Sequence, residues 1–316
     1  MADTEVAPTS PRPQPLRRLI DIARLCVVEA RPSVLLVFLL RFLVGSALSG
    51  IAAPRGDLGR IAAAAVVWEL AVFAVYLFNG VTDVQEDRIN GSRRPIARGA
   101  LPTATARRIT VGAAALSLIG GATLGGGLFW AVLALLTLGF CYSSPLVQLK
   151  RHAITSTLTG LSLGLLTYYA GHLAYAAAGS SYPGPEFVVF VAAVTTWMGL
   201  VGGLTKDLSD VAGDAAAGRR TVAGVHGEAA ARRAAAGAAL GLAVAFCAAG
   251  VWTSPLLIWP GLAMLGGAIA ITIVCLGGSA KRAESDSRRP YRAFMATQYL
   301  MNLGMIVALG GQLLFG

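Results

Sequence analysis

The sequence has little charge for its length. Only 13% of its 316 residues are charged and 55% are hydrophobic, whereas about 25% of the residues of soluble domains are charged. The mean hydropathy is +0.66. So few charges do not cover the surface of a soluble protein of this size, and disorder of the bulk of the chain is excluded on the same grounds. The composition predicts an integral membrane protein.

Cysteine and histidine are also scarce, with four and three residues. The cysteines are scattered and mostly lie in or beside apolar runs, which predicts reduced, packed thiols and excludes a disulfide scaffold. The absence of a His/Cys cluster with metal-ligand spacing argues against zinc or haem. No G-x-G-x-x-G or P-loop motif follows a strand-like run, which argues against a nucleotide-binding fold.

Apolar segments near 20 residues, by contrast, recur along the chain, and each is long enough to cross about 30 Å of hydrocarbon as a helix. They predict an all-α, polytopic membrane protein with nine transmembrane helices. The runs are too long, and lack the period-2 alternation, for an outer-membrane barrel. The segments are residues 33–53, 61–79, 109–124, 128–142, 154–178, 187–205, 234–251, 255–276 and 293–314.

Residues 1–32 differ from this transmembrane domain, which takes in residues 33–316. The first fifteen are Pro-rich and polar, and are expected to form a disordered tail. From Leu16 to Val27, apolar residues repeat at helical spacing with arginines between them, which predicts a short amphipathic helix at the membrane surface. A cleavable signal is not expected, because the long apolar run begins too late.

The distribution of basic residues predicts the orientation. Nine crossings place 23 of the 26 Lys and Arg residues on the side that holds the N-terminus, and the positive-inside rule makes that side cytoplasmic. The net charge of +10 is therefore mostly a matter of topology, and nucleic acid is not expected as a partner. The usage of Ala, Arg and Gly resembles high-GC bacterial coding, so the expected location is a bacterial cell membrane.

Acidic residues number only 16, so their clusters are informative. At the end of the second segment, Asn79, Asp83 and Asp87 stand at positions i, i+4 and i+8, which predicts one stripe down a helix face. The expected location of this stripe is the cytoplasmic boundary of the membrane.

A second cluster ends the sixth segment. Asp210 and Asp214 again stand four residues apart, with Asp207 one turn earlier. The distance from Asp83 to Asp210 is 127 residues, as is that from Asp87 to Asp214. This equal spacing suggests two pseudo-repeated four-helix halves plus one helix, with each half contributing carboxylates to a common cavity.

Two groups of carboxylates that face each other repel unless cations lie between them. Hard divalent ions suit carboxylate and amide oxygens, and Mg²⁺ commonly shares its shell with substrate phosphates. Basic residues such as Arg94, Lys150 and Lys206 accompany the clusters. Carboxylate, metal and basic side chains together are typical of a site that binds a diphosphate and neutralises it as it leaves.

These segments resemble the UbiA superfamily of intramembrane prenyltransferases. Four motifs in order carry the resemblance over about residues 30–235, and hydropathy carries it over the rest. The form Lys-Asp-x2-Asp is closer to the homogentisate- and chlorophyll-type branches than to the ubiquinone branch. The motifs are Arg31-Pro32; Asn79, Asp83 and Asp87 with Arg94-Pro95; Tyr142, Ser143, Pro145 and Lys150; and Lys206, Asp207, Asp210, Gly213 and Asp214, followed by Gly218 and Thr221.

The resemblance implies nine transmembrane helices around a central cavity, in which a prenyl diphosphate loses its diphosphate and an aromatic acceptor attacks the allylic cation. It implies catalytic roles for Lys150 and the four acids Asp83, Asp87, Asp210 and Asp214, with these acids and Asn79 holding Mg²⁺. The implied substrate-binding residues are Asn79, Arg94, Tyr142, Ser143, Lys206 and Asp207, and Arg41 is a further candidate from its position in the first segment. The faces of Tyr76, Phe78 and Tyr142 are candidates for stabilising the cation.

Arg41 lies inside the first segment, where charge is expensive. Two interpretations are open: it faces the cavity and meets an acceptor carboxylate or phosphate, or it pairs with Glu69 of the second segment.

Two other functions remain open. A terpene cyclase on the same scaffold would use the same ionisation without an acceptor, and the motifs do not separate the two enzymes. A transporter with acidic gating residues would instead need acids near the middle of the bilayer, whereas these acids lie at one face.

Overall fold

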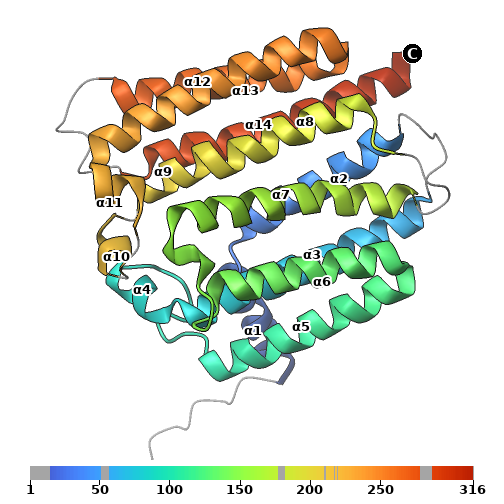
Figure 1. The fold of residues 1–316 in the computed structure, drawn as a ribbon. Coiled ribbons are helices and arrows are strands. Elements are labelled where there is room, and N and C mark those ends of the chain that lie inside the picture. Colours follow the sequence, from blue (N-terminus) through green and yellow to red (C-terminus); the bar gives the residue numbers. More distant parts are fainter. Residues whose placement is uncertain are drawn as a thin grey trace, which may run out of the picture.

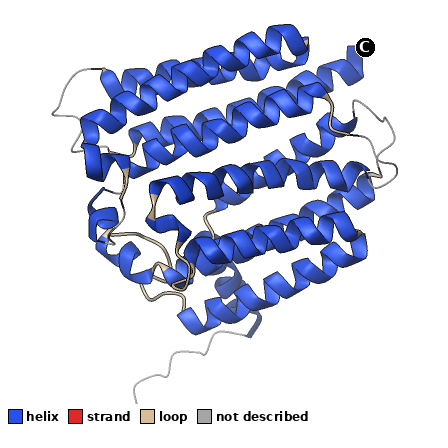
Figure 2. Cartoon of the chain, viewed as in Figure 1, coloured by secondary structure: helices blue, strands red, loops and turns tan. Residues whose placement is uncertain are grey.

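The computed structural model describes residues 15–50, 57–176, 182–209, 211–216, 218, 220–277 and 287–315. Within these ranges the chain forms helices and the loops that join them, and Figure 2 shows no strand. The predicted all-α class is therefore confirmed. The expected N-terminal tail lies almost wholly outside the described residues.

The helices follow one another through the whole described chain (Figure 1). Their bounds are α1 Pro15–Glu29, α2 Pro32–Gly50, α3 Leu58–Thr82, α4 Val84–Ile89, α5 Thr103–Leu124, α6 Gly126–Ser143, η1 Leu149–Arg151, α7 Ala153–Ala176, α8 Pro185–Thr196, η2 Trp197–Gly202, α9 Gly203–Asp207, α10 Val211–Ala216, α11 Val222–His226, α12 Glu228–Thr253, η3 Pro255–Leu257, α13 Ile258–Leu276 and α14 Arg289–Phe315.

The described residues of each of the nine expected apolar segments are largely helical. Seven of the helical stretches in the described part of the chain are long and apolar enough to cross a membrane. They are α2, α3, α6, the continuous run from α8 to α9, α12, η3 with α13, and α14. The remaining two segments correspond to α5 and α7, which are 22 and 24 residues long. The chain is thus an integral membrane protein with multiple spans.

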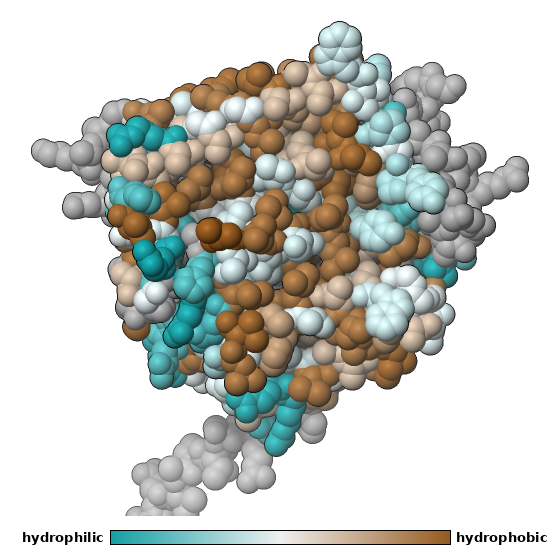
Figure 3. Space-filling view, in the orientation of Figure 1, coloured by the Kyte–Doolittle hydropathy of each residue, from teal (hydrophilic) through white to brown (hydrophobic). Residues whose placement is uncertain are grey.

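The long helices lie side by side and alternate in direction, and short elements gather at one end of the bundle (Figure 1). That end holds α4, α10 and α11, and α4 contacts α10. Figure 3 shows hydrophilic residues collected at the same end, while hydrophobic residues cover the length of the helices. Large apolar side chains such as Val111, Trp130 and Ile273 are exposed on the outer faces, as suits helices that contact lipid.

The two largest hydrophobic cores of the described residues join most of the long helices. One joins α2, α3, α6 and α7 and includes Phe42 and Trp68. The other joins the run from α8 to η2 with α12, α13 and α14, and includes Phe190 and Trp197. Residues of α2 enter both cores, and α2 also contacts α14. Helix α2 therefore connects the two groups of helices.

Helix α2 approaches α7 very closely because both carry glycine at the contact. A Cβ atom at Gly45 would overlap the backbone of Tyr168, and one at Gly171 would overlap the backbone of Phe42. Such approach through small residues is a common way to associate helices in lipid, where no hydrophobic force acts between them.

Candidate active site

A cavity of about 250 Å³ opens among the helix ends that carry the acid clusters. Its wall is built from α2, α3, α4, α6, η1, α7, η2, α9, α10 and α14 together with the adjoining loops. Of the residues predicted for the site, ten line it: Arg41, Asn79, Asp83, Asp87, Tyr142, Ser143, Lys150, Lys206, Asp207 and Asp214.

The first acid cluster lies where α3 ends. The predicted continuous stripe is wrong in one respect: α3 stops at Thr82, and Asp83 is a non-helical residue (φ −95°, ψ 11°) between α3 and α4. Backbone hydrogen bonds from Asp83 to Asn79 and from Asp87 to Asp83 span this break, so all three side chains still reach the cavity. The Asn79 amide donates to the Asp83 carboxylate at 2.9 Å.

Lys150 contacts this cluster from the short helix η1, which follows α6. Gln148, two residues earlier, has a left-handed backbone (φ 48°), and the turn there directs Lys150 inward, where it is 6% exposed. Its ammonium group pairs with the Asp83 carboxylate and lies 3.5 Å from the Glu86 carboxylate. Glu86 also lines the cavity, although the motif reasoning did not select it. Its place in the acidic run before Arg88 was the available signal.

Arg94 lies behind the cluster and is absent from the described lining of the cavity. Its Nη1 atom donates to Asp87 at 2.7 Å, and its Nε atom lies 2.8 Å from the carboxylate of Glu29 on α1. Glu29 is fully buried and also accepts a hydrogen bond from the backbone N–H of Ile96. Arg94 thus connects helix α1 to the carboxylate of Asp87.

The second acid cluster does not lie on one helix, contrary to the prediction. Helix α9 ends at Asp207, residues 208–209 form a turn, and α10 begins at Val211. Asp210 lies outside the described residues. Asp207 and Asp214 line the cavity, and Asp214 is 4% exposed. Because α10 contacts α4, the two clusters share one site.

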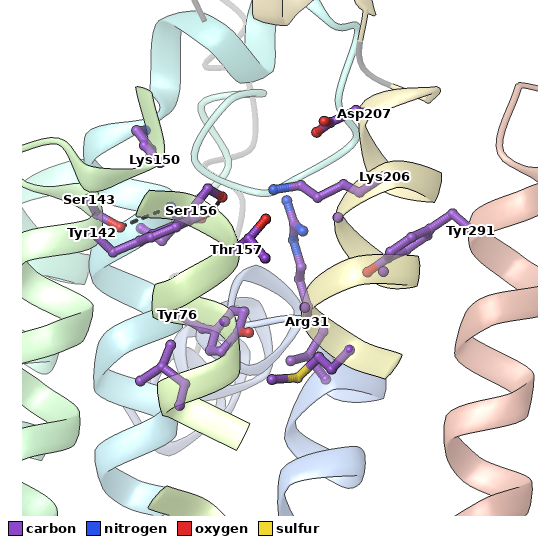
Figure 4. A pocket seen from close by; sticks show the side chains of 18 of the residues that line it. Arg31, Tyr76, Tyr142, Ser143, Lys150, Ser156, Thr157, Lys206, Asp207 and Tyr291 are labelled. Carbon is purple, nitrogen blue, oxygen red and sulfur yellow. Dashed lines mark hydrogen bonds between the residues drawn. The ribbon is translucent and has the colours of Figure 1, made fainter. Parts of the chain in front are cut away.

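Two further basic residues, Arg31 and Lys206, line the cavity. Figure 4 shows the side chains of Arg31 and Lys206 extending toward the same point, with Thr157 beside them. Arg31 has φ 62°, a left-handed conformation that is uncommon outside glycine and is often found at functional sites. Arg31 belongs to the Arg-Pro motif, but we had not predicted it as a site residue. Two like charges directed at one point favour an anion between them.

Aromatic side chains complete the wall. Tyr76, Tyr142 and Tyr291 line the cavity (Figure 4), and the Tyr142 hydroxyl lies 3.3 Å from that of Ser156. Phe78, a predicted member of this group, instead stacks on Phe140 at 5.4 Å and is not among the lining residues described. Tyr291 of α14 takes part although no motif pointed to it.

The donor set fits Mg²⁺ shared with a substrate better than a preformed metal cage. Among the described residues no group of three His, Cys, Asp or Glu side chains is arranged to hold an ion. Asp83 and Asp87 are paired with Lys150 and Arg94. Carboxylate and amide oxygens nevertheless face one cavity, and Mg²⁺ is usually held by one or two carboxylates plus phosphate oxygens and water.

Comparison with known proteins places the chain in a family. The model of the UbiA prenyltransferase family matches residues 38–303. A digeranylgeranylglyceryl phosphate synthase from Methanoculleus marisnigri is 31% identical over 78% of this chain and 82% of its own length. A probable homogentisate phytyltransferase 2 from Oryza sativa is 34% identical, but the match spans only 37% of that protein and 43% of this chain.

Solved structures share the fold. A UbiA homolog from Archaeoglobus fulgidus bound to DMAPP and Mg²⁺ superposes with a TM-score of 0.63 at 18% identity, over 88% of this chain and 99% of that one. A second structure of that homolog holds GPP and Mg²⁺. The fold is thus that of an intramembrane prenyltransferase. This chain belongs to the UbiA prenyltransferase family, as the motifs predicted.

Proposed function

We propose that the chain transfers a prenyl group from a prenyl diphosphate to an aromatic acceptor, with Mg²⁺ as cofactor. The observation that supports this function is the meeting of two sets of charges at one cavity among membrane helices. The carboxylates of Asp83, Asp87 and Asp214 line this cavity, and so do the cations Lys150 and Lys206. The relatives of the chain include a probable homogentisate phytyltransferase and a digeranylgeranylglyceryl phosphate synthase.

The side chains that would hold Mg²⁺ are Asn79, Asp83, Asp87, Asp214 and, by its motif position, Asp210. The bound metal would offset the negative charge that grows on the diphosphate as its bond to the prenyl carbon breaks. Lys150, Arg31 and Lys206 bind the leaving group directly. They surround the cavity from three different elements, so they hold the diphosphate in place without having to move.

The allylic cation that remains is protected by its surroundings. Tyr76, Tyr142 and Tyr291 present aromatic rings to the cavity, and such rings stabilise a nearby cation through their faces. The apolar side chains of Leu163 and Met198 line the part of the cavity between α7 and η2. They suit the prenyl tail and keep water away from the cation.

The proposal extends to the placement of the helices in the membrane. We propose that α5 and α7 also cross, which gives nine spans in two four-helix halves plus one. In this arrangement the end with α4 and α10 faces the cytoplasm of a bacterial cell. Helix α1 then lies on the cytoplasmic surface, with Leu16, Leu19 and Ile20 exposed toward lipid.

The test is product analysis by mass spectrometry with purified protein, Mg²⁺, a set of prenyl diphosphates and a set of phenolic acceptors. Asp83→Asn should reduce turnover by about two orders of magnitude or more, since it removes a charge from the metal and Lys150 together. Asp57→Asn is the matched control, because Asp57 caps the opposite end of the same helix α3. Equal activity in both variants would contradict the assignment.

The same assay separates the alternative enzyme. A cyclic hydrocarbon formed from a prenyl diphosphate without any acceptor would identify a terpene cyclase and exclude prenyl transfer as the main reaction. Omission of Mg²⁺ should stop either reaction.

A further inference from the structure

Arg41 is a buried cation that the diphosphate site does not use. It lies nine residues into α2, about 14 Å below the start of that helix at 1.5 Å per residue. Its exposed fraction is 2%, yet it lines the cavity. The other charged residues described in the lining lie at or near helix ends on the α4–α10 side, so Arg41 marks a separate, deeper part of the same cavity.

The partners of Arg41 leave part of its guanidinium unsatisfied. Its Nη2 atom donates to Gln298 on α14 at 2.6 Å, and its central carbon lies 5.1 Å from the ring centre of Phe38. The Nε and Nη1 atoms have no hydrogen-bond partner among the described residues. The interpretation in which Arg41 pairs with Glu69 is not supported, because no ion pair described joins the two and Glu69 Oε1 itself has no partner.

A polar network holds this cation in place from behind. The Tyr168 hydroxyl, close to Arg41, donates to Asn302 at 2.7 Å, and the Asn302 amide donates to the backbone carbonyl of Gln298 at 2.8 Å. The Gln298 Nε2 atom has no partner among the described residues. The cavity wall therefore carries a guanidinium with unused N–H donors on Nε and Nη1. Gln298 supports it from behind but carries no negative charge that would neutralise it.

A guanidinium without a counter-charge is unfavourable in the interior of a membrane protein, and removing it from water is compensated only by an anion with good geometry. Planar guanidinium groups match carboxylate and phosphate oxygens particularly well.

We propose that Arg41, held in place by Gln298, forms the acceptor subsite and binds an oxyanion, a carboxylate or a phosphate, on the acceptor molecule. This inference rests on the proposed prenyl transfer and narrows its acceptor to an acid. An acceptor held by its acid group at Arg41 extends from the deep part of the cavity toward the charged end, where the diphosphate departs. The nucleophilic group of the acceptor then meets the allylic carbon at a point between Arg41 and the diphosphate site.

The experiment compares acids with matched neutral molecules in detergent-purified protein. One arm uses homogentisate and its methyl ester, and the other uses a monoprenyl glyceryl phosphate and the corresponding monoprenyl glycerol. The first readout is the ligand-induced rise in Tm, which needs no turnover. The second is KM for the acceptor and for geranyl diphosphate. The variants are Arg41→Gln and Arg41→Lys, with Ser49→Ala as the control because Ser49 is buried on α2 but absent from the described lining.

We expect one acid to raise the Tm of the wild type more than its neutral partner does, and the arm that responds identifies carboxylate or phosphate. Arg41→Gln should raise the KM for that acid by about ten- to a hundredfold, the range for hydrogen bonds to a charged group. KM for geranyl diphosphate should change less than twofold, and Arg41→Lys should retain part of the affinity. Ser49→Ala should resemble the wild type.

The inference is overturned if neither acid exceeds its neutral partner in the wild type, or if Arg41→Gln binds the acid as well as the wild type does. The comparison of acid with ester in the wild type stands even if Arg41→Gln fails to fold. Failure of the proposed function looks different: wild-type protein would then release no pyrophosphate from geranyl diphosphate with any acceptor.

Discussion

At the scale of single residues, Gly80 shows how closely the site and its support are packed. A Cβ atom at this position on α3 would overlap the Glu29 carboxylate and lie 2.7 Å from Arg94 Nη2. The absence of a side chain at Gly80 is what lets Glu29 reach Arg94, and Arg94 in turn holds Asp87.

Gly80→Ala should therefore weaken both stability and catalysis. We expect the free energy of unfolding to fall by about 1–3 kcal/mol, the usual effect of overpacking. We also expect kcat to fall, because a displaced Arg94 no longer holds the Asp87 carboxylate in place. Thermal unfolding in detergent and turnover measure the two effects. Gly112→Ala on α5 is the control, since a Cβ there meets nothing within 4 Å. Equal effects of the two substitutions would contradict this account.

The role of Arg94 illustrates what the sequence does not reveal. Its place after the first acid cluster predicted contact with substrate, but the structure pairs it with Glu29, which is 65 residues away. No local pattern predicts such a long-range contact. The left-handed backbone of Arg31 is equally invisible, because nothing in the residue types requires it. Asn79, Asp83 and Asp87 were found because their spacing is a local property of a helix.

At the scale of elements, the close approach of α2 and α7 depends on two glycines. Gly171→Ala would place a Cβ against the carbonyl oxygen of Phe42, a backbone atom that moves only with its helix. Overpacking typically lowers the free energy of unfolding by about 1–3 kcal/mol, and we expect a loss at or above the upper end of that range. The loss is measured as a lower Tm in detergent. The control is Gly237→Ala on α12, where a Cβ meets nothing within 4 Å. An unchanged Tm for Gly171→Ala would show that the two helices can separate freely.

Helix α1 gives a second prediction at this scale. Leu19 is 64% exposed and Asp21 is exposed on the same helix, two residues or about 200° further round. A polarity-sensitive dye attached to Leu19→Cys should report a more apolar environment in lipid nanodiscs than the same dye on Asp21→Cys. Identical emission from both sites would argue that α1 stands clear of the lipid.

Hydropathy predicted the long helices well because a membrane span depends on local composition summed over many residues. The predicted segment 61–79 lies within α3 (Leu58–Thr82), and segment 128–142 lies within α6 (Gly126–Ser143). The interruptions at Asp83 and at residues 208–209 were not predicted. They depend on turns that pack α4 and α10 against each other, and hydropathy does not report such contacts.

At the scale of the whole molecule, the gathering of polar residues at one end predicts a single orientation in the membrane. In a background without native cysteines, Ala100→Cys lies in a loop at the end with α4, and Leu58→Cys lies at the opposite end of α3. A membrane-impermeant maleimide applied to intact bacterial cells should label Leu58→Cys and leave Ala100→Cys unlabelled until the cells are opened. The reverse pattern would place the cavity on the external side.

The π-helical turn η2, which lies between α8 and α9 beside the cavity, has a consequence for every residue that follows it. A π turn accommodates an extra residue relative to an α-helix, so it rotates the subsequent part of the helix by about 100°, the angle taken by one residue. Lys206 and Asp207 therefore occupy angular positions that an uninterrupted helix would not give them. The direction in which these two side chains point thus depends on the extra residue in η2, several residues earlier in the chain. Deletion of one residue between Trp197 and Gly202 would rotate both side chains away from the cavity.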